Sequence, residues 1–373
     1  MTTVGVPTEV KTDEYRVGMR PVGAEILTSD GHEVYIQSGA GLGCGYEDEM
    51  YIAAGATILQ TADEVWSSCD MIVKVKEPQP SEIKLIKEDQ IIFTFFHFAA
   101  DETMTKSVIE TGCLSMAYET VQLEDGSLPI LSPMSEVAGR MAVQEGAKFL
   151  EKVKGGKGIL LGGVPGVEPA KVTILGGGVV GTNAAFIAAG LGANVFILDV
   201  NLDRLRYLDE IMPKNVRTIY SNQLNIREHL RQTDLLIGAV LIPGAVAPKL
   251  VTRKMLKLMR PGSVIIDVAV DQGGCIETCK PTTHEDPIYV VDDIIHYCVA
   301  NMPGAVPYTS TTALTNATNP YIQKLANEGI QTALQNDAAL LHGLNMINGH
   351  VTHNAVAEAF DLNYTSPENT LKN

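Results

Sequence analysis

The sequence predicts an α/β protein with two domains, each built around a parallel β-sheet. The chain has 373 residues, more than the roughly 250–300 residues at which a single hydrophobic core stops growing. Short β-rich runs alternate with helical patterns along most of the chain, which is typical of parallel sheets covered by helices. A glycine-rich connector at 155–171 separates two such series, so we expect two α/β units of similar size.

The first series supplies the strands of an N-terminal domain. Strands are expected at 3–7, 32–37, 71–78, 90–98 and 113–121, with helices between them at 48–55 and 62–69. A longer amphipathic helix is predicted from Pro133 to Lys154, because Ser132 suits the N-cap and proline suits the first helical turn.

The second series follows the connector, with strands expected at 171–175, 194–200, 216–221, 234–240, 263–270 and 288–293. After the segment "NMPGAVP" (301–307) the pattern is helical and contains no predicted strand. Helices without a sheet of their own are expected to pack back on the first domain. The predicted domains are therefore a discontinuous one, 1–130 with 306–373, and one at 131–305.

The clearest motif is Gly176-x-Gly178-x-x-Gly181, between the strand at 171–175 and a helix of small residues. In a Rossmann fold the first glycine permits a tight turn, the second lets the backbone approach a pyrophosphate, and the third lets helix and strand pack closely. The phosphates would bind free N–H groups at the helix N-terminus. Asp199 ends the next strand, where an acid accepts hydrogen bonds from the adenosine ribose, so the motif predicts NAD rather than NADP.

A glycine-rich turn in a domain that binds no nucleotide is the alternative interpretation. Arg204 lies five residues after Asp199. It is placed to reach the adenosine portion, or it is an ordinary arginine on a helix surface.

The stretch "SVIIDVAVDQGG" (263–274) places two acids on one apolar strand. Asp271 comes at the carboxyl end and is followed by glycines that leave room for a substrate, so it is well placed for proton transfer beside a nicotinamide. Asp267 lies inside the strand, and we expect it to be buried and hydrogen-bonded.

Three polar residues lie at analogous strand ends of the first domain: Arg16, Lys76 and His97. Two cations can hold a carboxylate and polarise an adjacent carbonyl, with arginine as the bidentate partner, and histidine can carry protons near neutral pH. Each also has an ordinary interpretation. Arg16 could be a solvated surface charge, Lys76 a lysine that extends its amine to solvent, and His97 a core histidine.

Composition restricts the partners and the compartment. The formal net charge is −16, which argues against nucleic acid and anionic membranes as partners. The N-terminal segment lacks the apolar core of a signal peptide, and no apolar stretch is long enough to span a bilayer. The six cysteines show no paired zinc spacing. We therefore expect a cytoplasmic protein with free thiols and no metal site identified from sequence.

The chain resembles the alanine dehydrogenase family from about residue 3 to about residue 362. The resemblance is carried by "GVPTEVKTDEYRVGMRP", "VKVKEP", "LSPMSEVAGRMAVQ", "VTILGGGVVG", "DVAVDQGGCIET" and "NMPGAVP". It implies two Rossmann-like domains with parallel sheets, in which the nucleotide-binding domain is inserted into the substrate domain. It also implies a homohexamer. Some members of the family have a magnesium site near the C-terminal helix, but no ligand pair for one is evident here.

The resemblance implies a role for each candidate residue. Arg16 and Lys76 would hold the substrate, and His97 and Asp271 would act as catalytic acid/base groups. The cofactor contacts it implies, with the glycine loop, are Ser135, Gly176, Gly178, Val179, Val180, Gly181, Asp199, Arg204, Ser221, Val240, Leu241, Val268, Ala269, Val270, Asp271, Lys280, Val299, Ala300, Asn301 and Met302. The expected reaction is reversible conversion of L-alanine, NAD⁺ and water into pyruvate, ammonium and NADH.

Three alternatives remain open at this point. One is the NAD-binding subunit of a proton-translocating transhydrogenase, although its mobile loop carries an Arg-Gln-Asp triplet that "SPMSEVAGR" lacks. A lysine-forming saccharopine dehydrogenase shares the architecture but would require a more open pocket. The last is a catalytically silent NAD-binding or assembly protein, against which the full set of candidate residues argues.

Overall fold

The computed structural model describes residues 1–240, 247–270 and 273–370. The chain divides into two compact units. The first unit is Met1–Met134 with Gly304–Asn373, and the second unit is Ser135–Pro303.

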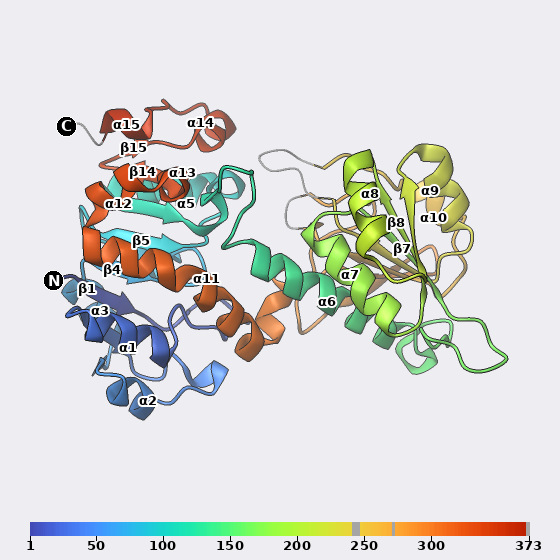
Figure 1. Cartoon of the computed structure of the whole chain (residues 1–373), viewed down its shortest axis with the longest axis horizontal. Helices are drawn as coiled ribbons and strands as arrows, with labels where there is room; N and C mark the ends of the chain where they lie inside the picture. The colour runs from blue at the N-terminus through green and yellow to red at the C-terminus, as the bar shows by residue number, and fades with distance from the viewer. Residues whose placement is uncertain (241–246, 271–272, 371–373) are drawn as a thin grey trace. The chain divides into compact units, whose positions relative to one another are not determined.

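The first unit contains an eight-stranded sheet in the order β15-β14-β6-β5-β4-β1-β2-β3 (Figure 1). Its strands are β1 (Thr3–Val6), β2 (Glu33–Gln37), β3 (Thr57–Leu59), β4 (Met71–Val73), β5 (Ile91–Thr94), β6 (Leu114–Ala117), β14 (Leu344–Ile347) and β15 (His350–Val351). Strands β1 to β6 pair in parallel. Strand β14 pairs antiparallel with β6, and β15 pairs antiparallel with β14.

Helices cover both faces of this sheet. They are α1 (Pro21–Ser29), α2 (Asp48–Ala53), α3 (Ala62–Ser68), α4 (Pro80–Ile83), α5 (Glu102–Thr111), α11 (Pro307–Glu328), α12 (Ile330–Asn336), α13 (Ala338–Gly343), α14 (Asn354–Phe360) and α15 (Pro367–Thr370). Val4 and Phe93 pack in a core with α1, α11, α12 and α13, whereas Ile72 and Ile92 pack in a second core with α3, α5 and α14. Since successive strand residues point to opposite faces, Ile92 and Phe93 belong to different cores, and the strands are apolar almost throughout.

The second unit contains a seven-stranded sheet in the order β12-β13-β11-β10-β7-β8-β9. Its strands are β7 (Lys171–Leu175), β8 (Asn194–Asp199), β9 (Val216–Tyr220), β10 (Leu235–Gly238), β11 (Val264–Asp267), β12 (Ile288–Val291) and β13 (Ile294–Tyr297). All pairings are parallel except that of β12 with β13. Without the edge strand β12, this is the strand order of the dinucleotide-binding Rossmann fold.

The helices of the second unit are α6 (Ser132–Phe149, whose first turn belongs to the first unit), α7 (Val179–Gly190), α8 (Leu202–Ile211), α9 (Gln223–Leu230) and α10 (Arg253–Leu256). Leu175, Leu198 and Leu236 pack with α9 and α10 in one core. Helix α7 packs on β7, β8 and β10, and its buried residues are small apart from Asn183, which allows a close approach to the strands. The predicted α/β class with two Rossmann-like sheets is confirmed.

The prediction that the C-terminal segment contains no strand is wrong. Strands β14 and β15 form a hairpin that extends the first unit's sheet. The turn between them is Asn348-Gly349, and both residues have positive φ angles, 50° and 76°. Asn-Gly is a strong signal for a two-residue hairpin turn, but each strand is short and the flanking helical pattern dominates the sequence.

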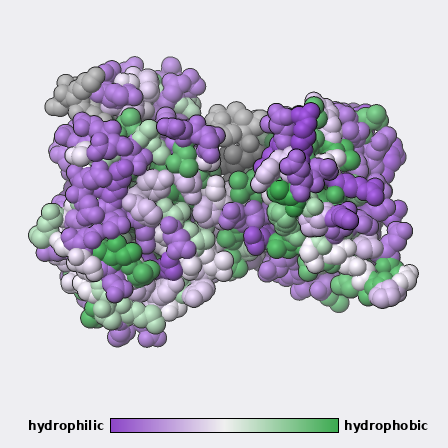
Figure 2. Space-filling view, in the orientation of Figure 1, coloured by the Kyte–Doolittle hydropathy of each residue, from purple (hydrophilic) through white to green (hydrophobic). Residues whose placement is uncertain are grey.

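Hydrophilic residues cover most of the molecular face shown in Figure 2, with smaller apolar areas between them. This surface agrees with the formal net charge of −16. In the described part of the chain, no helix combines the length and the apolar character that crossing a membrane requires.

Candidate active site

Three predicted site residues lie at one edge of the first unit's sheet. Arg16 follows β1, Lys76 follows β4 and His97 follows β5. Because β1, β4 and β5 are parallel neighbours, the segments after them leave the sheet at the same edge. The strand order reverses between β1 and β4, and open α/β sheets bind ligands beside the carboxyl ends of their strands at such a point.

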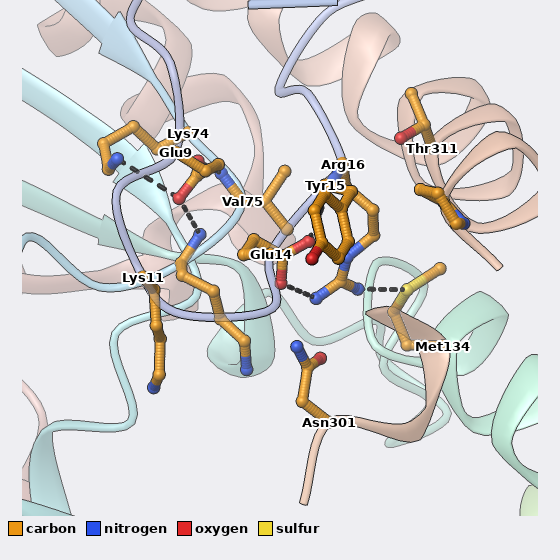
Figure 3. A network of polar contacts seen from close by, with 12 residues as sticks. Glu9, Lys11, Glu14, Tyr15, Arg16, Lys74, Val75, Met134, Asn301 and Thr311 are labelled. Carbon is orange, nitrogen blue, oxygen red and sulfur yellow. Dashed lines mark hydrogen bonds and ion pairs between the residues drawn. The ribbon is translucent and has the colours of Figure 1, made fainter. Parts of the chain in front are cut away.

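Arg16 is a buried residue held by Glu14, not a solvated surface charge (Figure 3). Its Nε and Nη2 atoms donate to Oε1 and Oε2 of Glu14, each at 2.6 Å, and its Nη1 donates to Sδ of Met134 at 3.1 Å. The two charged side chains are 2% and 0% exposed. A bidentate pair of this kind fixes the plane of the guanidinium, so Glu14 determines how Arg16 can meet a ligand.

A second buried carboxylate, Glu9, organises the segment after β4 (Figure 3). Its Oε1 accepts the N–H of Val75 at 2.6 Å, and its Oε2 accepts the N–H of Lys76 at 3.3 Å. The ammonium of Lys74, which is fully buried, donates to Glu9 at 3.2 Å and to Glu82 at 2.6 Å. The backbone leading to Lys76 is therefore fixed by charge pairs below the surface.

The ionisation of these buried groups is interdependent. Burial raises the pKa of Glu9 above its ordinary value, against the opposing effect of the Lys74 charge. Burial alone would lower the pKa of Lys74, but the carboxylates of Glu9 and Glu82 hold it above its ordinary value. A buried lysine between two carboxylates remains charged because both partners are hydrogen-bonded to it.

Lys76 is half-buried, unlike a lysine that extends freely to solvent. Burial lowers the pKa of Lys76, and the nearby positive charge of Arg16 lowers it further. Two cations that repel one another at one sheet edge form a site at which an anion is stabilised.

His97 lies in a left-handed backbone conformation, with φ 52° and ψ 40°. Its ring stacks on Phe95 with centroids 5.8 Å apart and an interplanar angle of 3°. The imidazole is 32% exposed, and its Nδ1 lies 4.0 Å from Oε1 of Glu119. A histidine at the surface of a strand end is accessible to a ligand, so the core interpretation does not apply.

Sequence reasoning missed the acids that hold these three residues: Glu9, Glu14 and Glu119. A signal was present, because Glu14 lies two residues before Arg16 and Glu119 two residues after β6. A polar side chain just after one parallel strand can reach the loop that follows the neighbouring strand.

The glycine motif of the second unit has the geometry that the sequence predicts. Gly176 has φ 99°, and a Cβ on Gly181 would lie 1.9 Å from the carbonyl oxygen of Gly176. A Cβ on Gly178, the N-cap of α7, would meet no atom of the described residues within 4 Å. The first and third glycines are therefore required by the protein itself, whereas the second, at a helix N-terminus, has space beside it as far as residues 1–240, 247–270 and 273–370 are concerned.

Asp199 and Arg204 hold this turn. Oδ2 of Asp199 accepts the N–H of Gly177 at 2.6 Å. Nε of Arg204 donates to the carbonyl of Gly177 at 2.6 Å, and its Nη2 donates to the hydroxyl of Thr182 at 2.7 Å. Arg204 is therefore engaged with the glycine turn itself rather than lying as an isolated surface charge.

Most other predicted cofactor residues lie at carboxyl ends of the second unit's strands. Ser221 follows β9, Val240 follows β10, Val268 to Val270 follow β11, and Val299 to Met302 follow β13. Val179 and Val180 open α7, and Ser135 lies in α6. Lys280 is exposed, with its Nζ 4.9 Å from the centre of the Tyr289 ring. Leu241 and Asp271 lie outside the described residues.

Asp267 is fully buried at the end of β11, as predicted. Its Oδ1 accepts the N–H of Ala269 at 3.2 Å, and its Oδ2 accepts those of Cys275 at 3.0 Å and Ile276 at 3.2 Å. Burial raises the pKa of Asp267 to about 6, although these three hydrogen bonds favour the carboxylate. Asp267 thus ties Ala269, just after β11, to Cys275 and Ile276.

Among the described residues, no group of three or more His, Cys, Asp or Glu side chains is arranged to hold a metal ion.

Two family profiles together match most of the chain. Residues 5–138 match the profile "Alanine dehydrogenase/PNT, N-terminal domain", and residues 142–354 match "Alanine dehydrogenase/PNT, C-terminal domain". An alanine dehydrogenase of Methanococcus maripaludis is 57% identical over 369 residues, 99% of either chain.

Two solved structures are similar over nearly the whole chain. An L-alanine dehydrogenase superposes with a TM-score of 0.93 at 51% identity, covering 96% of this chain and 99% of that one. A transhydrogenase from Sinorhizobium meliloti superposes with a TM-score of 0.79 at 25% identity, covering 95% of this chain and 99% of that one.

Proposed function

The chain belongs to the alanine dehydrogenase/PNT family, and from this premise we propose the residues and the cofactor with which it works as an L-alanine dehydrogenase. The proposed reaction interconverts L-alanine, NAD⁺ and water with pyruvate, ammonium, NADH and a proton. The observation that carries the proposal is the arrangement of Arg16, Lys76 and His97 at the carboxyl ends of three neighbouring parallel strands.

We assign substrate binding to the first unit. Arg16 binds the substrate carboxylate, because its guanidinium is held in a fixed plane by Glu14. Lys76 binds the carbonyl oxygen of pyruvate or the corresponding oxygen of the hydrated intermediate. The buried pairs beneath both residues support this role, since they fix the guanidinium of Arg16 and the backbone that carries Lys76 before the substrate arrives.

We assign nucleotide binding to the second unit, and its residues fit NAD. The open space at Gly178 admits a pyrophosphate against the N-terminus of α7. The carboxylate of Asp199, at the end of β8, suits the ribose hydroxyls of NAD and disfavours the 2′-phosphate of NADP. NAD, when bound, supplies the hydride acceptor for oxidation of the alanine Cα.

The chain's own residues carry the proton transfers. His97 and Asp271 accept and return protons as water adds to the imino acid and as the carbinolamine releases ammonium. The stacked Phe95 ring restricts the imidazole to one plane, which favours transfer along a defined direction.

The proposed substrate domain is 1–130 with 306–373, and the proposed NAD domain is 131–305.

The proposal is tested by initial rates of reduced nucleotide formation with L-alanine, glycine, L-serine and L-2-aminobutyrate, each with NAD⁺ and with NADP⁺. We expect the highest kcat/KM with L-alanine and NAD⁺. His97→Ala and Asp271→Asn should each lower kcat by roughly 10²-fold or more. Absence of NADH formation from L-alanine would contradict the function, and near-normal kcat in both variants would contradict the residue roles.

The same preparations test the remaining proposals. Hydride transfer from NADH to an NADP-loaded partner protein, without activity on alanine, would favour the transhydrogenase alternative. A cytoplasmic homohexamer is proposed from the family resemblance, and size-exclusion chromatography with light scattering measures the number of subunits.

A further inference from the structure

A single carboxylate connects the ends of β5 and β6 in the first unit. Glu119 lies in the 3₁₀ turn Tyr118–Thr120, directly after β6. Its Oε1 accepts the N–H of His97 at 2.5 Å. The N–H of Phe96 lies 3.2 Å from Oε1 and 3.3 Å from Oε2. Two successive backbone donors thus converge on one side chain that lies 22 residues further along the chain.

These hydrogen bonds stabilise an unfavourable backbone conformation. A residue other than glycine in the left-handed region is strained unless its surroundings compensate. At His97 the compensation comes from the carboxylate, since charge-assisted hydrogen bonds are about twice as strong as neutral ones. The turn directs the His97 ring onto Phe95, so the position of the imidazole depends on Glu119.

The same carboxylate also lies close to the imidazole ring. Oε1 of Glu119 lies 4.0 Å from Nδ1 of His97, and the Glu119 side chain is only 15% exposed. The Glu119 charge also acts on His353, at the start of α14. Burial lowers the pKa of His353, the Glu119 charge opposes this, and His342 of α13 adds to the lowering. A lowered pKa disfavours the charged form of His353.

We propose that Glu119 is a positioning residue for His97, holding the left-handed turn that orients the imidazole and supplying the negative charge that favours the imidazolium during proton transfer. This inference rests on the proposed function, because it requires that His97 carry protons in the reaction. A purely structural role would require only the backbone hydrogen bonds. The two roles are separable, because glutamine keeps an acceptor oxygen for the N–H groups but removes the charge.

The test measures kcat and KM for pyruvate reduction against pH in Glu119→Gln, Glu119→Asp and the matched control Glu124→Gln. Glu124 is an exposed acid in the connection after the same 3₁₀ turn. For Glu119→Gln we expect kcat to fall about tenfold, with KM for pyruvate within about threefold of wild type. The midpoint of the acid–base limb in the kcat profile should move to lower pH, because the negative charge 4.0 Å from Nδ1 is removed. Glu124→Gln should match wild type.

Glu119→Asp keeps the charge but is one methylene shorter. We expect a lowered kcat with a profile midpoint closer to wild type than that of Glu119→Gln. This variant also decides the question if Glu119→Gln fails to fold, because wild-type kcat in Glu119→Asp would overturn the positioning role. Melting temperature and NADH binding, measured for every variant, distinguish a folding defect from a kinetic one.

A wild-type kcat in Glu119→Gln, or a lowered kcat with an unmoved profile, overturns the inference. His97→Asn separates this failure from failure of the proposed function. If His97→Asn is inactive while Glu119→Gln behaves as wild type, only the role of Glu119 is wrong. If His97→Asn retains near-normal kcat, the role assigned to His97 is wrong and the present inference falls with it. In a His97→Asn background, Glu119→Gln should cause no further loss.

Discussion

The carboxylate of Glu14 accepts two hydrogen bonds of 2.6 Å from the guanidinium of Arg16. Both side chains are almost completely buried. A buried charge that loses its partner costs on the order of 3–5 kcal/mol. The pair therefore orients the Arg16 guanidinium after the strand end, and loss of either partner should destabilise the protein.

Glu14→Gln tests the dependence of substrate binding on this pair. We expect KM for pyruvate to rise at least tenfold with a smaller change in kcat, because the guanidinium loses its bidentate partner and its fixed plane. The melting temperature should also fall. Steady-state kinetics and thermal unfolding measure both effects, with Glu124→Gln as the exposed control. An unchanged KM would mean that Arg16 is oriented by other contacts.

The glycine turn offers two matched substitutions with opposite expected outcomes. Gly181→Ala should destabilise the second unit, because the new Cβ would lie 1.9 Å from the carbonyl of Gly176. Gly178→Ala should leave stability unchanged, because its Cβ meets no atom of the part of the chain that the structure describes within 4 Å. It should nevertheless weaken NADH binding by about tenfold or more, since the methyl group occupies the space proposed for the pyrophosphate.

Thermal unfolding and NADH fluorescence titration distinguish the two glycine variants. If Gly178→Ala binds NADH as tightly as wild type does, the pyrophosphate does not approach the turn at Gly178.

Asp199→Ala tests the proposed preference for NAD. The variant should lower kcat/KM for NAD⁺ about tenfold. The ratio of kcat/KM with NAD⁺ to kcat/KM with NADP⁺ should also fall, because a carboxylate no longer repels the 2′-phosphate of NADP⁺. Part of the loss comes from the glycine turn, since Asp199 also accepts the N–H of Gly177. Asp203→Ala, which removes an exposed acid of α8, is the control. A ratio of kcat/KM values unchanged from wild type would contradict the role of Asp199.

The sheets were predictable from the sequence where a pattern is local. The glycine motif, the apolar strands and the polar residue after each strand all lie within short windows. Strands β3 and β13 are not among the predicted strands. At 288–293 the pattern predicts one strand that ends on its acids. Asp292 and Asp293 are the turn, with φ 51° and 62°, and β13 follows directly. Two successive left-handed residues are characteristic of a tight hairpin, and aspartate tolerates this conformation.

The side chains that support the site were not predictable, because their partners are distant in the chain. Glu9 meets Lys74 across 65 residues, and Glu119 meets His97 across 22. A sequence pattern places each acid near a strand end, but only the strand order brings β1 beside β4 and β5 beside β6. The identity of each pair is therefore a property of the topology.

Asp267 predicts a pH dependence of stability. Its pKa is raised from an ordinary value of 3.8 to about 6, so the folded protein binds this proton more tightly than the unfolded chain. The stabilisation is fully present below about pH 4 and is lost as the pH rises through about 6, an effect on the order of 3 kcal/mol. Relative to Asp267→Asn, the wild type should lose stability over this interval.

Thermal unfolding of both proteins between about pH 4 and pH 7 measures the effect, with Asp286→Asn as the control at an exposed acid of the same unit. A constant offset between wild type and Asp267→Asn is expected in addition, because an amide cannot accept all three N–H groups that the carboxylate accepts. Only the part of the difference that varies with pH reports the ionisation. A difference that stays constant across the interval would mean that Asp267 ionises with the same pKa in the folded and unfolded chains, and that its three hydrogen bonds offset the cost of burying its charge.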